Sequence, residues 1–72
     1  MIEKLFDNII SAAAEAAPRA RRLELGRAKD EVIDARRAGL IGRAAADELI
    51  GFTRRLIGAA EDELVKAGDW VY

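Results

Sequence analysis

The chain of 72 residues contains no cysteine and no histidine. Without cysteine it forms neither a disulfide framework nor a thiolate metal site. The absence of histidine excludes the usual zinc sites, the Cys–His and Ser–His nucleophiles and imidazole pH switches. We therefore expect no metal, no cofactor and no catalytic centre of these kinds.

Large hydrophobic side chains are also scarce. Hydrophobic residues make up 51% of the chain, but 15 of them are alanines, which leaves only 22 larger ones. A chain of this length lies near the lower limit for a self-sufficient core. Because so few large side chains are available for burial, a monomer is expected to be marginally stable. The composition therefore predicts self-association, most simply a homodimer.

Long apolar runs and a large net charge are missing as well. No run approaches the ~20 residues that cross a bilayer, and Asp7 and Glu15 interrupt the layout of a secretory signal. The net charge of −1 predicts no general attraction to nucleic acid or membranes. We expect a cytoplasmic protein. Nine arginines against three lysines, together with the many alanines, suggest a GC-rich bacterial or phage genome.

The clearest pattern is a helical period over residues 43–67. It spans seven turns and predicts one long amphipathic helix with more than one neighbour. Gly51 and Gly58 lie seven residues apart on its polar side, either as part of a solvated face or as a groove for a second helix. The apolar face is formed by Ala45, Ala46, Leu49, Phe52, Thr53, Leu56, Ala60, Leu64 and Ala67.

Two further helices are expected before it, at residues 2–17 and 19–38. The polar face of the first is acidic on balance, which favours packing in a core over anchoring at a membrane surface. Pro18 is the only proline, and it leaves open whether the two helices are separate or one helix is kinked there. Gly39 and Gly42 bracket a short connection that predicts an αα-hairpin.

These elements together predict an all-α fold with residues 1–72 in one domain. We expect a small three-helix chain with a C-terminal antiparallel αα-hairpin, a short aromatic tail at 68–72 and assembly into a homodimeric helical bundle. Some large aliphatic residues lie beside the main apolar faces of the second and third helices, and these are the predicted oligomer interface: Leu23, Ile33, Ile50 and Ile57.

The segment 19–29 is basic, with five cations against Glu24. It is interpreted as a solvated face, as a contact for an acidic protein or as a nucleic-acid contact. No aromatic residues are interleaved, so a stacking surface for single strands is not supported. We expect reversal of the charges of Arg21 and Arg22 to leave stability nearly unchanged or to raise it, unless these arginines pair with the acidic cluster 61–63. The predicted partner-binding residues are Arg19, Arg21, Arg22, Arg27 and Lys29.

Two other features bear on partners. A DNA-reading helix-turn-helix is disfavoured, because the helix that would enter the major groove begins with Arg43 but continues with alanines and acids. At the C-terminus, Trp70 and Tyr72 either cover the end of the bundle or dock on a partner as aromatic anchors.

An enzyme is the least expected class, because the carboxylates lie on polar helix faces and so small a bundle offers little pocket. We expect a non-enzymatic helical module that binds and modulates a larger protein, such as an inhibitor or adaptor derived from a phage or mobile element. Its expected partners are a second copy and a protein with an acidic surface. A small helical nucleic-acid-binding protein is the alternative.

Overall fold

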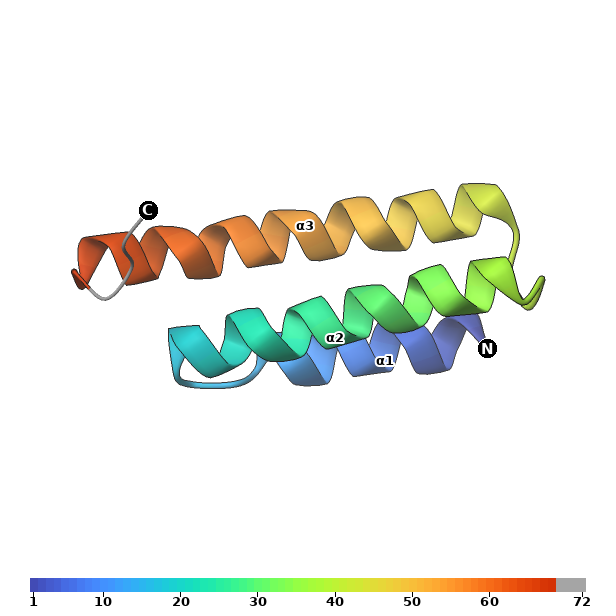
Figure 1. Ribbon diagram of the computed structural model, residues 1–72. Coiled ribbons are helices and arrows are strands. Elements are labelled where there is room, and N and C mark those ends of the chain that lie inside the picture. Colours follow the sequence, from blue (N-terminus) through green and yellow to red (C-terminus); the bar gives the residue numbers. More distant parts are fainter. Residues whose placement is uncertain (69–72) are drawn as a thin grey trace.

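The computed structural model describes residues 1–68, and this part of the chain folds into three α-helices. They are α1 (Ile2–Ala13), α2 (Pro18–Arg37) and α3 (Arg43–Lys66). Figure 1 shows α3 returning along α2, while α1 lies against α2 with its N-terminus near the α2–α3 connection. The molecule measures 40 × 21 × 14 Å. The all-helical expectation is confirmed for these residues.

Helix α1 ends at Ala13, four residues before the expected end at 17. The next helix begins with Pro18 at its first position, after Ala17 in an extended conformation with φ −80° and ψ 123°. Proline disfavours a helical residue before it and fits the first helical position well. The two helices are therefore separate. The ends of α2 and α3 lie one residue before the expected ends, within the usual uncertainty of helix boundaries.

The connection between α2 and α3 is a Schellman motif followed by a buried isoleucine. Gly39 has φ +76°, in the left-handed region that favours glycine. The Leu40 N–H donates to the Ala35 carbonyl at 2.9 Å, and the Gly39 N–H donates to the Arg36 carbonyl at 3.0 Å. Ile41 is buried, but Leu40 is 59% exposed. Only Ile41 therefore packs inward from this turn.

Side chains from all three helices form the core, and alanine contributes much of it. The only polar residue buried within residues 1–68 is Thr53, whose hydroxyl donates to the Leu49 carbonyl at 2.6 Å. Phe6 of α1 stacks on Phe52 of α3 with ring centroids 5.7 Å apart. The buried hydrophobic residues are Leu5, Ile9, Ala12, Leu25, Ala28, Val32, Ala35, Ile41, Ala46, Leu49, Ala60 and Leu64.

Within residues 1–68, no helix combines the length and apolar character that crossing a bilayer requires.

Candidate interaction surface

A groove runs between α2 and α3, and no residue of α1 lines it. It consists of two adjoining hollows of about 720 and 370 Å³, which share Arg54. We call it the α2–α3 groove. From α2 it is lined by Arg22, Gly26, Lys29, Ile33, Arg36 and Arg37, and from α3 by Asp47, Ile50, Gly51, Arg54, Ile57, Gly58 and Glu61.

The rim of the groove is basic. Five of its lining side chains are cationic and two are acidic, a local excess of three positive charges on a chain whose net charge is −1. Four of the cations come from α2, at Arg22, Lys29, Arg36 and Arg37. Because most of these positions are spaced by about two helical turns, they lie along one side of the helix. The α2 side of the groove therefore attracts anions, whereas Asp47 and Glu61 on the α3 side repel them.

The middle of the groove is apolar. Ile33, Ile50 and Ile57 are partly buried there. A Cβ atom placed on Gly26, Gly51 or Gly58 would meet no atom of residues 1–68 within 4 Å, apart from the chain neighbours and the nearby backbone of its own helix. Packing within the monomer therefore does not require glycine at these positions. The groove combines an aliphatic strip with open space above the backbone.

The structure brings together three of the four predicted interface residues. Ile33, Ile50 and Ile57 all line the groove, whereas Leu23 is 55% exposed and lines none of its hollows. Sequence reasoning missed Arg36, Arg37 and Arg54 as members of this surface. The seven-residue interval from Lys29 to Arg36 is a signal that predicts a shared helical side.

The predicted basic segment is divided among different surroundings. Arg22 and Lys29 line the groove, while Arg27 lines a different hollow between α1 and α2. Arg19 is exposed in the first turn of α2. Trp70 and Tyr72, predicted as partner-binding anchors, lie outside the described residues.

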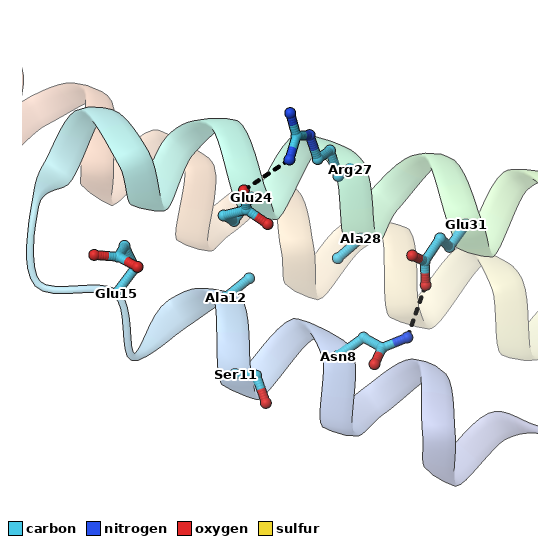
Figure 2. Close-up of a pocket in the computed structure, with 8 residues that line it drawn as sticks. All are labelled: Asn8, Ser11, Ala12, Glu15, Glu24, Arg27, Ala28 and Glu31. Atoms are coloured by element: carbon cyan, nitrogen blue, oxygen red, sulfur yellow. Dashed lines mark hydrogen bonds and ion pairs between the residues drawn. The ribbon is translucent and has the colours of Figure 1, made fainter.

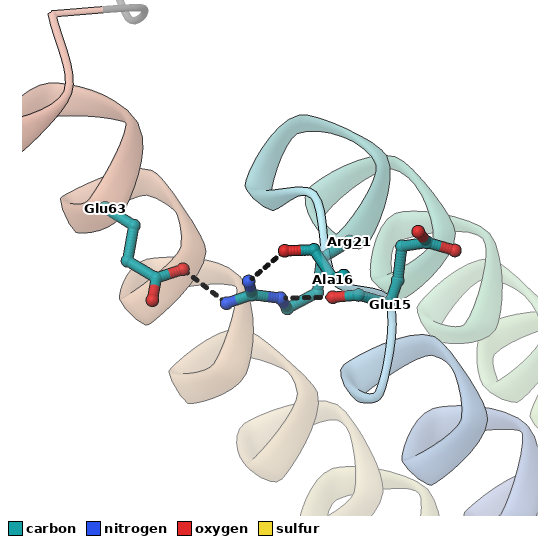
Figure 3. Close-up of polar contacts among 4 residues, drawn as sticks. All are labelled: Glu15, Ala16, Arg21 and Glu63. Carbon is teal, nitrogen blue, oxygen red and sulfur yellow. Dashed lines mark hydrogen bonds and ion pairs between the residues drawn. The ribbon is translucent and has the colours of Figure 1, made fainter.

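Arg21 is engaged inside the fold, as Figure 3 shows. Its Nε donates to the Glu15 carbonyl at 2.9 Å, and its Nη2 donates to the Ala16 carbonyl at 3.2 Å. Its Nη1 pairs with the Glu63 carboxylate of α3, and the side chain is only 19% exposed. Arg21 therefore ties the α1–α2 connection to α3.

Arg22 also reaches the acidic cluster of α3, with its Nε 3.8 Å from Glu61 Oε2. Arg21 and Arg22 therefore both pair with the acidic cluster 61–63. This is the case in which we expected the two arginines to contribute to stability. This geometry argues against our expectation that reversing the charges of Arg21 and Arg22 leaves stability unchanged.

A second hollow, of about 500 Å³, lies between α1 and α2 and is shown in Figure 2. Three glutamates line it, but its polar groups largely pair with one another. Asn8 Nδ2 donates to Glu31 Oε2 at 2.7 Å, and Arg27 pairs with Glu24 at 3.0 Å. Among residues 1–68, no cluster of three or more acidic side chains is placed to hold a metal ion. We therefore regard the α2–α3 groove as the stronger candidate.

The α2–α3 groove has the chemistry to bind an anionic, partly apolar chain. Its cations are held on two packed helices, so they are positioned before a partner arrives. Comparisons with protein-family models, with curated proteins and with solved structures found no match to this chain.

Proposed function

We propose that this protein is a non-enzymatic interaction module that binds an acidic segment of a larger protein in the α2–α3 groove and thereby modulates it. The observation that carries the proposal is the excess of three positive charges around an aliphatic strip. An amphipathic helix with acidic flanks matches both features, because its apolar side covers the isoleucines while its carboxylates meet the rim.

Nucleic acid fits the same groove less well. No aromatic side chain among residues 1–68 lines it, so this part of the chain gives bases no surface on which to stack. Asp47 and Glu61 stand on the rim and repel phosphates. The four cations along one side of α2 nevertheless favour nucleic acid enough to keep it as the alternative.

We also propose that the module, while its groove is free, forms a homodimeric helical bundle built on an antiparallel hairpin of α2 and α3. Among residues 1–68, seven large hydrophobic side chains are buried and seven are exposed. A second copy that covers part of the exposed set would add to a core that five alanines make thin. The cytoplasmic location and the phage or mobile-element origin stay predictions.

The proposed function is tested by changing charge at the groove and, in a matched control, elsewhere. Lys29→Glu with Arg37→Glu removes two rim cations; Lys4→Glu with Arg27→Glu changes the net charge equally outside the groove. The probe is a synthetic helical peptide with a leucine stripe flanked by glutamates. We expect the groove variant to bind about tenfold more weakly, mainly through slower association, because steering charges act on that rate. An equal loss in both variants contradicts the proposal.

Random duplex DNA, titrated with salt, tests the alternative. Phosphate binding weakens steeply as salt rises, because bound counterions are released. Strong, salt-sensitive DNA binding that the groove variant loses, combined with no binding of the acidic peptide, would replace the proposal with the nucleic-acid function.

A further inference from the structure

The solvent-facing side of α3 carries three pairs of like charges whose sign alternates, and one residue of each pair also lines the α2–α3 groove. They are Asp47–Glu48, Arg54–Arg55 and Glu61–Asp62, at intervals of seven residues. Seven residues make nearly two helical turns, so the pairs follow one another along one side of the helix. Five of the six side chains are exposed, and Glu61 is partly exposed. This side of α3 is therefore acidic, then basic, then acidic.

Small residues lie between the charged pairs at the same interval. Gly51 and Gly58 are followed, seven residues later, by Val65, which is 43% exposed. Apart from proline, glycine is the least favourable residue in a helix interior. Within residues 1–68, no other helix or side chain comes within 4 Å of a Cβ placed at either glycine, its two chain neighbours apart. The fold of the monomer gives no reason for these two glycines, whereas a closely packed neighbour would.

We propose that a second copy of the chain docks antiparallel along this side of α3, with the two-fold axis passing near Gly58. This arrangement places Arg54 beside Glu61 of the second copy and Arg55 beside Asp62 of the second copy, because the two-fold axis brings the same flank of each helix together. Symmetry repeats both contacts, because a two-fold interface uses the same patch on each subunit. The inference rests on the proposed self-association and assigns an interface to it. Gly51, Arg54, Gly58 and Glu61 also line the α2–α3 groove, so a second copy docked here and the acidic segment of the larger protein exclude each other.

The central glycines allow the two α3 backbones to approach closely at the axis. Val65 of each copy then lies above Gly51 of the other, so an exposed aliphatic side chain fills the space that a missing side chain leaves. Glu61 is already 3.8 Å from Arg22 within the monomer. A carboxylate accepts several hydrogen bonds, so it can also meet an arginine of the second copy.

The charge order selects the second copy as the occupant, because it is complementary to itself only in a shifted antiparallel alignment. A parallel alignment in register, or an antiparallel one centred on Arg54 and Arg55, places the two basic pairs together. An axis at Gly51 pairs the basic residues with Asp47 and Glu48 but leaves Val65 uncovered. The axis at Gly58 is the alignment that uses the charges and Val65 together.

Charge reversal in the full chain tests the alignment by sedimentation equilibrium. Arg54→Glu with Arg55→Glu makes all three pairs acidic, whereas Glu61→Arg with Asp62→Arg leaves only the first pair acidic. Each variant alone places like charges opposite each other at the interface, so we expect its dimer to dissociate about tenfold or more readily than that of the unmodified chain. An equal mixture of the two variants is expected to form a heterodimer, because the opposite signs meet again.

Gly58→Ala separates the interface from the fold. In the monomer the new methyl group meets no atom within 4 Å, so the helix content of dilute samples should stay equal or rise. At the dimer axis the same group holds the backbones apart, and we expect about tenfold weaker dimerisation. Gly26→Ala, on α2, is the matched control and should leave dimerisation unchanged.

The outcomes distinguish failure of this inference from failure of the proposed self-association. A chain that stays monomeric at all concentrations overturns both. A dimer that survives both charge variants and Gly58→Ala overturns the interface alone. Loss of the dimer in Ile10→Glu, without loss in the α3 variants, would place the second copy on the exposed residues of α1 instead. Heterodimer formation in the mixture supports the proposed alignment.

Discussion

At the scale of single residues, Arg21 shows that a charged residue expected to bind a partner can instead connect elements of the fold. The sequence places it in a basic segment and predicts partner binding. In the structure its guanidinium supplies donors to the Glu15 and Ala16 carbonyls, which follow the end of α1. The last carbonyls of a helix and those just beyond it need such donors, and arginine presents five in a fixed fork. Its third partner, Glu63, is 42 positions away in sequence, which explains why local pattern did not reveal it.

Replacing Arg21 by alanine should therefore destabilise the protein. We expect a loss of about 1–3 kcal/mol, because hydrogen bonds from a charged donor are removed and two carbonyls lose their partner. The exposed Glu63 carboxylate adds little to this figure, because solvent screens it. Arg21→Lys should recover only part of the loss, since lysine lacks the planar fork. Urea unfolding at one fixed protein concentration measures the difference.

Arg27→Ala is the matched control for this prediction. Its pair with Glu24 lies within one helix and is well exposed, so we expect a change of about 0–1 kcal/mol. If the Arg21 and Arg27 variants unfold at the same urea concentration, the link between the α1–α2 connection and α3 contributes nothing to stability.

At the scale of elements, periodicity predicted α2 and α3 almost to their ends but misplaced the end of α1. Residues 14–17 are alanine and glutamate, which favour helix, so nothing in that stretch itself predicts a stop. The restriction that Pro18 places on Ala17 separates the two helices, but it does not act on residues 14–16. The end of α1 at Ala13 therefore has no explanation in the local sequence.

Helix α1 also shows that a wide apolar face does not indicate which of its residues become buried. Residues 2–17 were expected to pack in the core, and Leu5 and Ile9 do so. Ile2, Phe6 and Ile10 belong to the same arc but are 49%, 42% and 45% exposed. Helix α1 packs mainly on α2 and only slightly on α3. The width of an arc follows from the sequence, but the position of the neighbours that cover it does not.

Two glycines should respond to alanine in opposite directions. Gly26 lies in the middle of α2 with open space around it, so Gly26→Ala should stabilise the protein by about 0.5–1 kcal/mol. Gly39 has φ +76°, where a side chain is strained, so Gly39→Ala should cost about 1–2 kcal/mol. Thermal unfolding followed by circular dichroism compares the two variants. Equal shifts of the same sign would show that the left-handed turn is not needed after α2.

At the scale of the whole molecule, the sequence identified parts of the candidate surface without assembling them. Ile33, Ile50 and Ile57 were predicted because they lie beside the main apolar faces. Arg22 and Lys29 were found through the basic segment. These five residues form one surface with Arg36, Arg37 and Arg54 only because of how α3 packs against α2. Periodicity gives the face of each helix, but only the packed pair shows which two faces border one groove.

The response of self-association to salt distinguishes the two faces on which a second copy can dock. An interface along α3 depends on opposite charges, and these are screened as the Debye length falls from about 10 Å at 0.1 M salt to about 3 Å at 1 M. We therefore expect the dimer to weaken by roughly tenfold over that range, while the helix content of dilute samples changes little because the core is apolar. An interface on Ile2, Phe6 and Ile10 of α1 would instead be unaffected or strengthened, since burial of apolar surface does not depend on charge. Sedimentation equilibrium in NaCl at both concentrations measures the change. A dimer that becomes more stable as salt rises would contradict the α3 interface and favour one on α1.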